Sequence, residues 1–243
     1  MQKTFNAALA ALNRRNFFEA ERLFREVLTA DPKHIPSLNL LTVVLMSMDR
    51  CDEAEKFIAR AVKLDRRSDV SFYNYGVISK RLNKPRQALE QFNKAIDLNA
   101  KVPETWNNRG TIYNDLENYE AALSDFNCAI ELNGEYSDAY ANKGKSLFKL
   151  KRYDEALAAY DKALSLRPDL AEAWLGRGNV NNELKRYTDA VAAYDNALKL
   201  NPRLPEAWIG RGNLFYNLSN YDEAAAAYDQ ALALEADTAG AWE

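Results

Sequence analysis

The chain has 243 residues, of which 47% are hydrophobic and 28% are charged, a composition typical of a folded protein. No apolar run approaches the roughly 20 residues that a membrane span needs, and the N-terminal segment lacks the layout of a signal peptide. The single histidine, His34, argues against a histidine-built zinc site or a His-based catalytic triad. Two widely separated cysteines, Cys51 and Cys128, are compatible with a reducing compartment, so we expect a cytoplasmic protein.

The net charge of −3 is unevenly distributed along the chain. Residues 1–102 carry 18 Lys and Arg against 12 Asp and Glu, whereas residues 103–243 carry 14 against 23. The acidic part is a poor surface for nucleic acid, and the basic part has no dense cluster of Lys and Arg. We therefore expect neither a nucleic-acid partner nor a membrane partner.

A 34-residue period organises the chain from its first residue without an insertion. The tripeptides 138–140, 172–174 and 206–208 are each 34 residues apart and read DAY, EAW and EAW. Such a period is the signature of a repeat architecture. Seven blocks result: 1–34, 35–68, 69–102, 103–136, 137–170, 171–204 and 205–238.

The last five residues, 239–243, fit the start of a truncated eighth block, with Trp242 at position 4. Block 7 carries no polar capping helix, so we expect the chain to be a piece of a longer protein. Its C-terminal end would then be apolar and open to association.

The residues at each position of a block predict a pair of helices. Position 4 is large in six blocks, position 8 is small in all seven, and position 20 is always alanine. Spacings of three and four residues place positions 4, 8, 11 and 14 on one helical stripe, and positions 17, 20, 24, 27 and 28 on another. Small residues let two helix backbones approach, and the large ones fill the space beside them. All seven prolines fall where a helix would begin or end.

In chain order, blocks 1 and 2 depart most from this pattern, since Thr42 and Leu45 replace the small and aromatic residues and Arg66 replaces proline. Blocks 3 to 7 follow it closely. The whole pattern resembles the tetratricopeptide repeat family. That resemblance implies an all-α, right-handed superhelical solenoid of antiparallel helix pairs, whose first helices line a concave groove. Stacking is also expected on physical grounds, because a single helix pair cannot bury its apolar face.

The residues offer no catalytic, cofactor or metal site, so we expect no enzyme activity in this chain. Gly176-Arg177-Gly178 and Gly210-Arg211-Gly212 fall inside predicted helices and cannot cradle a phosphate, which requires a strand before the loop. Acidic pairs such as Asp154–Glu155 open second helices, where they complement the helix dipole.

The resemblance implies that positions 2, 5, 6, 9, 12 and 13 of each first helix face the groove. One end of the groove would then be apolar, with Phe5, Leu9, Leu12, Leu40, Val43, Met46, Tyr73 and Val77. The other end would be rich in amides and is the predicted partner-binding groove, with Asn107, Asn108, Asn114, Asn142, Lys145, Asn179, Asn182, Glu183, Asn213, Tyr216 and Asn217. Asparagine donates and accepts hydrogen bonds without charge, so a row of them can bind the N–H and C=O groups of an extended peptide.

Three functions remain open from the sequence. The first is a protein-interaction scaffold that binds an extended peptide or a partner helix. The second is the substrate-recruiting repeat region of a larger glycosyltransferase, because position 6 resembles the asparagine ladder of O-linked N-acetylglucosamine transferases at Asn6, Asn74, Asn108 and Asn142, with Gly176 and Gly210 interrupting it. The third is a structural oligomer that self-associates through the apolar groove or the C-terminal end. The asparagines themselves have a second interpretation, which is solvation of an exposed helix face.

A second row of charged residues accompanies the amides in blocks 4 to 7. Position 7 holds Arg109, Lys143, Arg177 and Arg211, and position 25 holds Asn127, Asp161, Asp195 and Asp229. We predict a ladder of ion pairs between helices, with the arginine stems covering apolar surface. The alternative is a cationic stripe for an acidic ligand.

Overall fold

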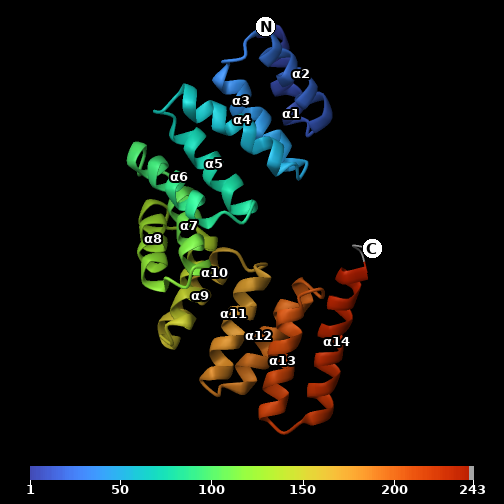
Figure 1. Cartoon of the computed structure of the whole chain (residues 1–243). Helices are drawn as coiled ribbons and strands as arrows, with labels where there is room; N and C mark the ends of the chain where they lie inside the picture. The colour runs from blue at the N-terminus through green and yellow to red at the C-terminus, as the bar shows by residue number, and fades with distance from the viewer. Residues whose placement is uncertain (241–243) are drawn as a thin grey trace. The chain divides into compact units, whose positions relative to one another are not determined.

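The computed structural model describes residues 1–240, without the side chains of residues 235 and 237–240. The described residues form fourteen helices and no strand, two helices for each predicted block (Figure 1). The helices are α1 (Gln2–Asn13), α2 (Phe17–Ala30), α3 (Ile35–Ser47), α4 (Cys51–Leu64), α5 (Asp69–Arg81), α6 (Pro85–Leu98), α7 (Pro103–Asp115), α8 (Tyr119–Leu132), α9 (Ser137–Lys149), α10 (Tyr153–Leu166), α11 (Ala171–Glu183), α12 (Tyr187–Leu200), α13 (Pro205–Asn217) and α14 (Tyr221–Gly240). We call the first helix of each block its A helix and the second its B helix.

The same turn ends every A helix. Position 15 of each block has a positive φ between 53° and 61°, although none of the seven residues is glycine. A residue in this left-handed conformation closes the helix and reverses the chain toward the B helix. The seven residues are Arg15, Asp49, Asn83, Glu117, Lys151, Lys185 and Ser219.

The helix starts follow the sequence signals. Pro85, Pro103 and Pro205 each occupy the first position of a helix, where no intrahelical N–H partner is needed. The side chains of Asn16 and Asn118 cap α2 and α8 by accepting hydrogen bonds from backbone N–H groups of the first turn.

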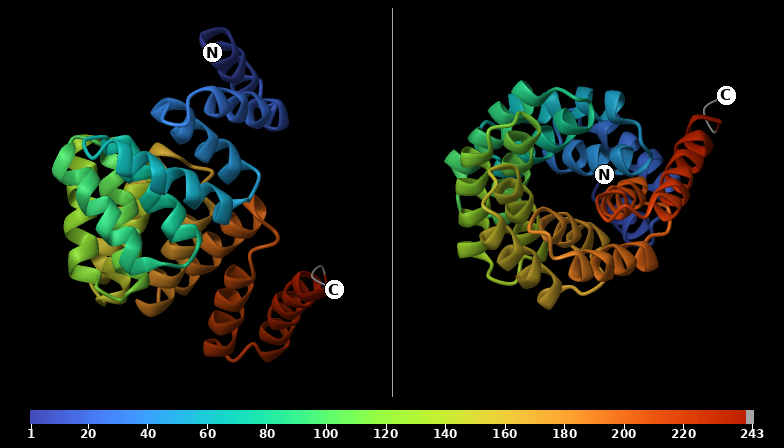
Figure 2. Two further views of the ribbon diagram at one scale, coloured as in Figure 1. Left: turned by 45° about the horizontal axis from the view of Figure 1, so that its top comes forward. Right: turned by 90° about the horizontal axis from the view of Figure 1, so that it is seen from below.

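The chain divides into two compact units, residues 1–116 and residues 117–243, and the boundary lies between the two helices of the fourth block. Unit 1 contains α1 to α7, and its largest core cluster includes Phe24, Leu41 and Ile58, all completely buried. Unit 2 contains α8 to α14, with a core around Leu147 and Val180. Within each unit, every helix packs on the next one along the chain, and α5 also touches the A helices α3 and α7, as α11 touches α9 and α13 (Figure 2).

The packing confirms the predicted all-α fold of helix pairs. The alanine at position 20 is completely buried in the first six blocks and is 3% exposed at Ala224. Because this position is buried in the helix packing, a larger side chain there would force neighbouring helices apart.

The last helix departs from the pattern. The B helices of the first six blocks end at position 30, whereas α14 continues to Gly240. Residues 239 and 240, which the sequence assigns to an eighth block, therefore belong to α14. Trp242 lies outside the described residues.

Candidate functional site

The A helices of unit 2 line a groove of about 470 Å³. Three residues of the predicted amide-rich groove lie in it together, namely Asn142 and Lys145 of α9 and Asn179 of α11. Phe148 and Leu175 supply apolar walls. The groove therefore combines polar groups with apolar surface, as peptide-binding and small-molecule sites do.

Tyr160 of α10 forms the floor of this groove and is only 5% exposed. Its ring lies between two glycines, Gly144 of its own block and Gly176 of the next block. A Cβ atom on Gly176 would lie 2.5 Å from the Tyr160 hydroxyl oxygen, and one on Gly144 would lie 2.9 Å from Cε1 of the ring. Glycine at these two positions, position 8 of block 5 and position 6 of block 6, therefore provides the space for Tyr160.

The hydroxyl of Tyr160 differs from those of the equivalent tyrosines in blocks 6 and 7. Tyr194 donates a hydrogen bond to Asn179 Oδ1 at 2.8 Å, and Tyr228 donates to Asn213 Oδ1 at 2.7 Å. Both asparagines stand at position 9 of an A helix. In block 5 this position is Lys145, which has no acceptor atom. No group in residues 1–240 accepts a hydrogen bond from Tyr160, and burial raises the pKa of this phenol above its ordinary value.

The remaining polar groups divide the groove into two sides. Lys145 and Lys149 of α9 have no carboxylate within 4.0 Å in the described part of the chain. Glu172 and Glu206 face them from the first turns of α11 and α13, where acidic residues complement the helix dipole. The groove therefore offers hydrogen-bond donors along α9 and acceptors at the starts of α11 and α13.

The other predicted polar residues of unit 2 do not line this groove. Asn213, Tyr216 and Asn217 are exposed on α13, and Tyr216 packs its ring edge against Tyr221. Asn182 is half-buried, and Glu183 accepts a hydrogen bond from the Tyr153 hydroxyl.

In unit 1, the predicted amides have little free surface. Asn107 and Asn114 of α7 are 7% and 8% exposed. Asn108 donates one hydrogen bond to the Tyr73 hydroxyl at 3.2 Å and another to the Glu104 carbonyl. Asn108 is therefore bonded within its own unit, and Asn107 and Asn114 offer little surface to a ligand.

The predicted apolar end of the groove is half-buried. The side chains of Phe5, Leu9, Leu12, Leu40 and Met46 pack against the main core cluster of unit 1. Val43 is also half-buried, and Tyr73 and Val77 pack on a smaller cluster around Phe92. Most of the apolar area that the sequence assigned to a ligand is therefore used in packing.

The charged row at position 7 forms the predicted ion pairs in blocks 6 and 7, and a hydrogen bond in block 4. Arg177 Nε lies 2.8 Å from Asp161 Oδ1, and Arg211 Nε lies 3.8 Å from Asp195 Oδ1. Arg109 donates a hydrogen bond to the Asn93 side chain at 2.7 Å. In each case the partner is position 25 of the preceding block, so the ladder connects successive blocks.

A tryptophan at position 4 supports each of these arginines. The guanidinium carbons of Arg109, Arg177 and Arg211 lie 4.8, 5.6 and 5.7 Å from the ring centres of the tryptophans in their own blocks. The three indole N–H groups donate to backbone carbonyls at position 32 of the preceding block, with distances between 2.8 and 3.1 Å. The three tryptophans are Trp106, Trp174 and Trp208.

Two further observations concern residues 1–240. No group of three or more His, Cys, Asp or Glu side chains there is placed to hold a metal ion. None of the helices in that range has the length and apolar character needed to cross a bilayer.

Comparison with protein families identifies the repeats. Models described as tetratricopeptide repeat match residues 103–136, 141–205 and 183–241, which together exceed half of the chain. A model described as the TT21 fifth ARM repeats domain matches residues 5–109. A comparison with curated protein sequences gives no match.

Solved structures share the fold at low sequence identity. A tetratricopeptide repeat protein from Parabacteroides merdae is 17% identical, with a TM-score of 0.77 over 96% of this chain and 92% of that one. A chain of the APC/C hetero-tetramer Cut9-Hcn1 is 21% identical, with a TM-score of 0.76 over 88% of this chain and 42% of that one. YrrB, described as a TPR protein with an unusual peptide-binding site, is 22% identical, with a TM-score of 0.62 over 76% of this chain and 95% of that one. With its seven helix pairs and the family matches over residues 103–241, this chain belongs to the tetratricopeptide repeat family.

Proposed function

We propose that this chain is a protein-interaction scaffold that binds an extended peptide segment of a partner in the groove of α9, α11 and α13. Repeats of this family typically bind proteins or peptides, and one similar structure is described by its peptide-binding site. The step from the fold to this groove depends on the groove's own chemistry, because one fold supports many functions.

The observation that carries the proposal is the hydroxyl of Tyr160. It lies at the groove floor in a side chain that is 5% exposed, and no group in the described residues accepts a hydrogen bond from it. Its oxygen is not among the fully buried polar atoms that lack a hydrogen bond, so the hydroxyl contacts the solvent of the groove. A ligand carbonyl in the groove would accept this hydrogen bond in place of water.

An extended peptide fits the arrangement of the remaining groups. Its carbonyls can accept from Tyr160 and from the Asn179 amide nitrogen, and its N–H groups can donate toward Glu172 or Glu206. An apolar side chain of the peptide would pack on Phe148 and Leu175. Three A helices spaced roughly 8–10 Å apart span about 20 Å, the length of about six extended residues.

The test begins with selection of peptides on the intact chain from a displayed library of random twelve-residue sequences. Calorimetry then compares the selected peptides on the wild type, on Tyr160→Phe and on Tyr194→Phe. Tyr160→Phe removes a donor that the folded chain does not use, so we expect weaker binding with unchanged or higher stability. Tyr194→Phe is the matched control, since it breaks an internal hydrogen bond and should lower stability more than affinity.

Lys145 provides a second, independent test. Lys145→Asn gives Tyr160 the acceptor that Tyr194 and Tyr228 have, whereas Lys145→Ala only removes the cation. We expect Asn to impair binding more than Ala, and to raise the melting temperature. Selected peptides that bind all four variants like the wild type, or a library that yields no binder, would overturn the proposal.

A further inference from the structure

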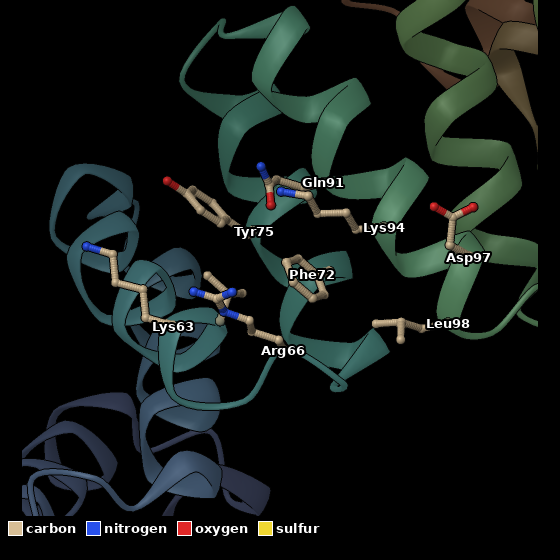
Figure 3. Close-up of a pocket in the computed structure, with 9 residues that line it drawn as sticks. Lys63, Arg66, Phe72, Tyr75, Gln91, Lys94, Asp97 and Leu98 are labelled. Atoms are coloured by element: carbon tan, nitrogen blue, oxygen red, sulfur yellow. The ribbon is translucent and has the colours of Figure 1, made fainter.

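A second hollow lies in unit 1, at a distance in sequence from the peptide groove. It has a volume of about 540 Å³ and lies between α4 and α6, with Phe72 and Tyr75 of α5 at its base (Figure 3). Cavities of 300–1,000 Å³ are typical of ligand sites. Nothing in the proposed peptide binding uses this hollow.

The position-7 arginine of blocks 4, 6 and 7 has no counterpart in block 3, whose Tyr75 lines the hollow. In blocks 4, 6 and 7 that arginine stacks on the ring at position 4 and reaches position 25 of the preceding block. Block 3 has Tyr75 at position 7, and block 2 has Ala59 at position 25. The Tyr75 hydroxyl accepts a hydrogen bond from Gln87 of its own block at 2.7 Å.

The base of the hollow is apolar, and its rim is mainly cationic. Phe72 is almost buried at the centre, and in Figure 3 the side chains of Arg66 and Lys94 lie beside its ring. Lys94 Nζ lies 5.6 Å from the Phe72 ring centre and 2.6 Å from a carboxylate oxygen of Glu90. Lys63 completes the rim of cations, and Asp97 is the carboxylate that lines the hollow.

Two of these cations have no acidic partner. Within residues 1–240, no carboxylate lies within 4.0 Å of the side chains of Lys63 or Arg66, and both residues are exposed. Because residues 1–102 carry 18 basic against 12 acidic side chains, the surrounding field also favours an anionic ligand.

We propose that this hollow docks an acidic segment of a partner protein, distinct from the peptide of the concave groove. An apolar or aromatic side chain of the segment packs on Phe72, and flanking carboxylates pair with Lys63 and Arg66. A basic segment would place its own cations beside Lys63 and Arg66 and would bring no carboxylate to pair with them. Charge complementarity therefore selects the partner, and the ring of Phe72 anchors it.

The probe is the acetylated and amidated peptide Glu-Glu-Trp-Glu-Glu, titrated into the intact chain at low salt by calorimetry. Two matched probes replace all four Glu by Lys, or Trp by Ala. We expect saturable binding of the first probe, weaker binding when Trp is Ala, and loss of binding with Lys. The affinity should fall by about tenfold when the salt concentration is raised to screen exposed charges.

Variants assign the binding to this hollow. Lys63→Ala combined with Arg66→Ala should weaken the acidic probe by about tenfold, as two lost ion pairs predict. Arg67→Ala is the control, because Arg67 is an exposed neighbouring cation that does not line the hollow. Ala59→Asp combined with Tyr75→Arg rebuilds the ladder seen at Arg177 and Asp161, fills the hollow and should abolish binding.

Several results would overturn the proposal. Lys63 and Arg66 are exposed, so the variant that changes both of them should fold. Equal affinity of that variant and of the wild type for the acidic probe would therefore exclude the hollow as the site. Equal binding of the acidic and basic probes would exclude charge selection. The absence of any detectable heat of binding at a probe concentration of about 1 mM would also contradict the proposal. A Kd of that size corresponds to a binding free energy of roughly −4 kcal/mol.

Discussion

The side chain of Arg177 in α11 crosses to the preceding block and donates from Nε to Asp161 Oδ1 of α10 at 2.8 Å. The same guanidinium stacks on Trp174, whose indole N–H is bonded to the Pro168 carbonyl. Blocks 6 and 7 are each joined to the preceding block in this way, through a stacked cation, an ion pair and an indole hydrogen bond. This combination sets the register between neighbouring helix pairs.

The first prediction concerns this ladder. Arg177→Ala should lower the free energy of unfolding by about 1 kcal/mol, because it removes a partly exposed ion pair and a cation–π contact. A double-mutant cycle with Asp161→Ala should give a coupling energy of about 0.5 kcal/mol in urea denaturation. The pair Arg211 and Asp195, separated by 3.8 Å, is the control and should couple less. Reversal to Arg177→Asp should lower the melting temperature, and an unchanged value would contradict a structural ladder.

The second prediction concerns the glycines beside Tyr160. Gly176→Ala gains about 1 kcal/mol of helix propensity, but its Cβ atom would overlap the Tyr160 hydroxyl. Overpacking of this kind typically costs about 1–3 kcal/mol, so the net effect should be destabilising. Gly134→Ala is the control, because a Cβ atom there meets nothing within 4 Å. Thermal denaturation that ranks the two variants equally would contradict the packing account.

The third prediction concerns the left-handed turn at position 15. Lys185 has a φ of 59°, a conformation that costs a residue with a Cβ atom roughly 1–2 kcal/mol. Lys185→Gly removes that cost but adds backbone entropy to the unfolded chain, so stability should rise by about 0.5 kcal/mol. Asn83→Gly should gain less, because asparagine tolerates this conformation better than lysine. Urea midpoints of the two variants give the comparison, and a loss of stability in Lys185→Gly would show that the side chain has another role.

The fourth prediction concerns acid stability in unit 1. Burial alone would raise the pKa of Glu21, but hydrogen bonds from Arg50 at 2.6 Å and Arg25 at 2.8 Å outweigh it and hold that pKa below its ordinary value. The unfolded chain therefore binds this proton more readily than the folded one. The stabilisation is complete above the ordinary glutamate pKa of about 4.3 and is lost as the pH falls through the lower folded value.

Glu21→Gln tests this linkage. The stability difference between wild type and variant should be largest at neutral pH and should shrink at acidic pH, measured by urea unfolding across the range. Glu26→Gln is the control on the same helix, where the carboxylate and its partner Arg22 are both largely exposed. A difference that is independent of pH would contradict the assigned ion pairs.

The fold could be predicted from the sequence because the repeat period and the helical spacing act on every block alike. Ala20 and Ala156 are buried where the pattern required small residues, and Pro103 opens a helix where it predicted one. The ladder was also predicted, but each arginine at position 7 pairs with position 25 of the preceding block and not of its own block. Sequence spacing does not show which neighbouring B helix an A-helix side chain reaches.

The groove was only partly predictable. Asn142, Lys145 and Asn179 do lie together, whereas Asn107 and Asn114 are nearly buried. Gly176 interrupts the row of asparagines in the sequence, and the structure shows that its space is taken by Tyr160 of another block. The packing of a tyrosine ring against a glycine of another block is a tertiary contact, so the spacing of residues within a single helix does not predict it. The one available signal was lysine at position 9 of block 5, where blocks 6 and 7 have asparagine.

The most direct test of the proposed groove is the affinity of one library-selected peptide for the wild type, for Lys145→Ala and for Lys145→Asn. Because the Tyr160 hydroxyl bonds to no described group of the chain, we predict that Asn lowers the affinity further than Ala while raising the melting temperature, since Tyr160 then bonds within the chain. Equal affinities in the two variants, with no gain in stability for Asn, would show that Tyr160 does not hold the peptide.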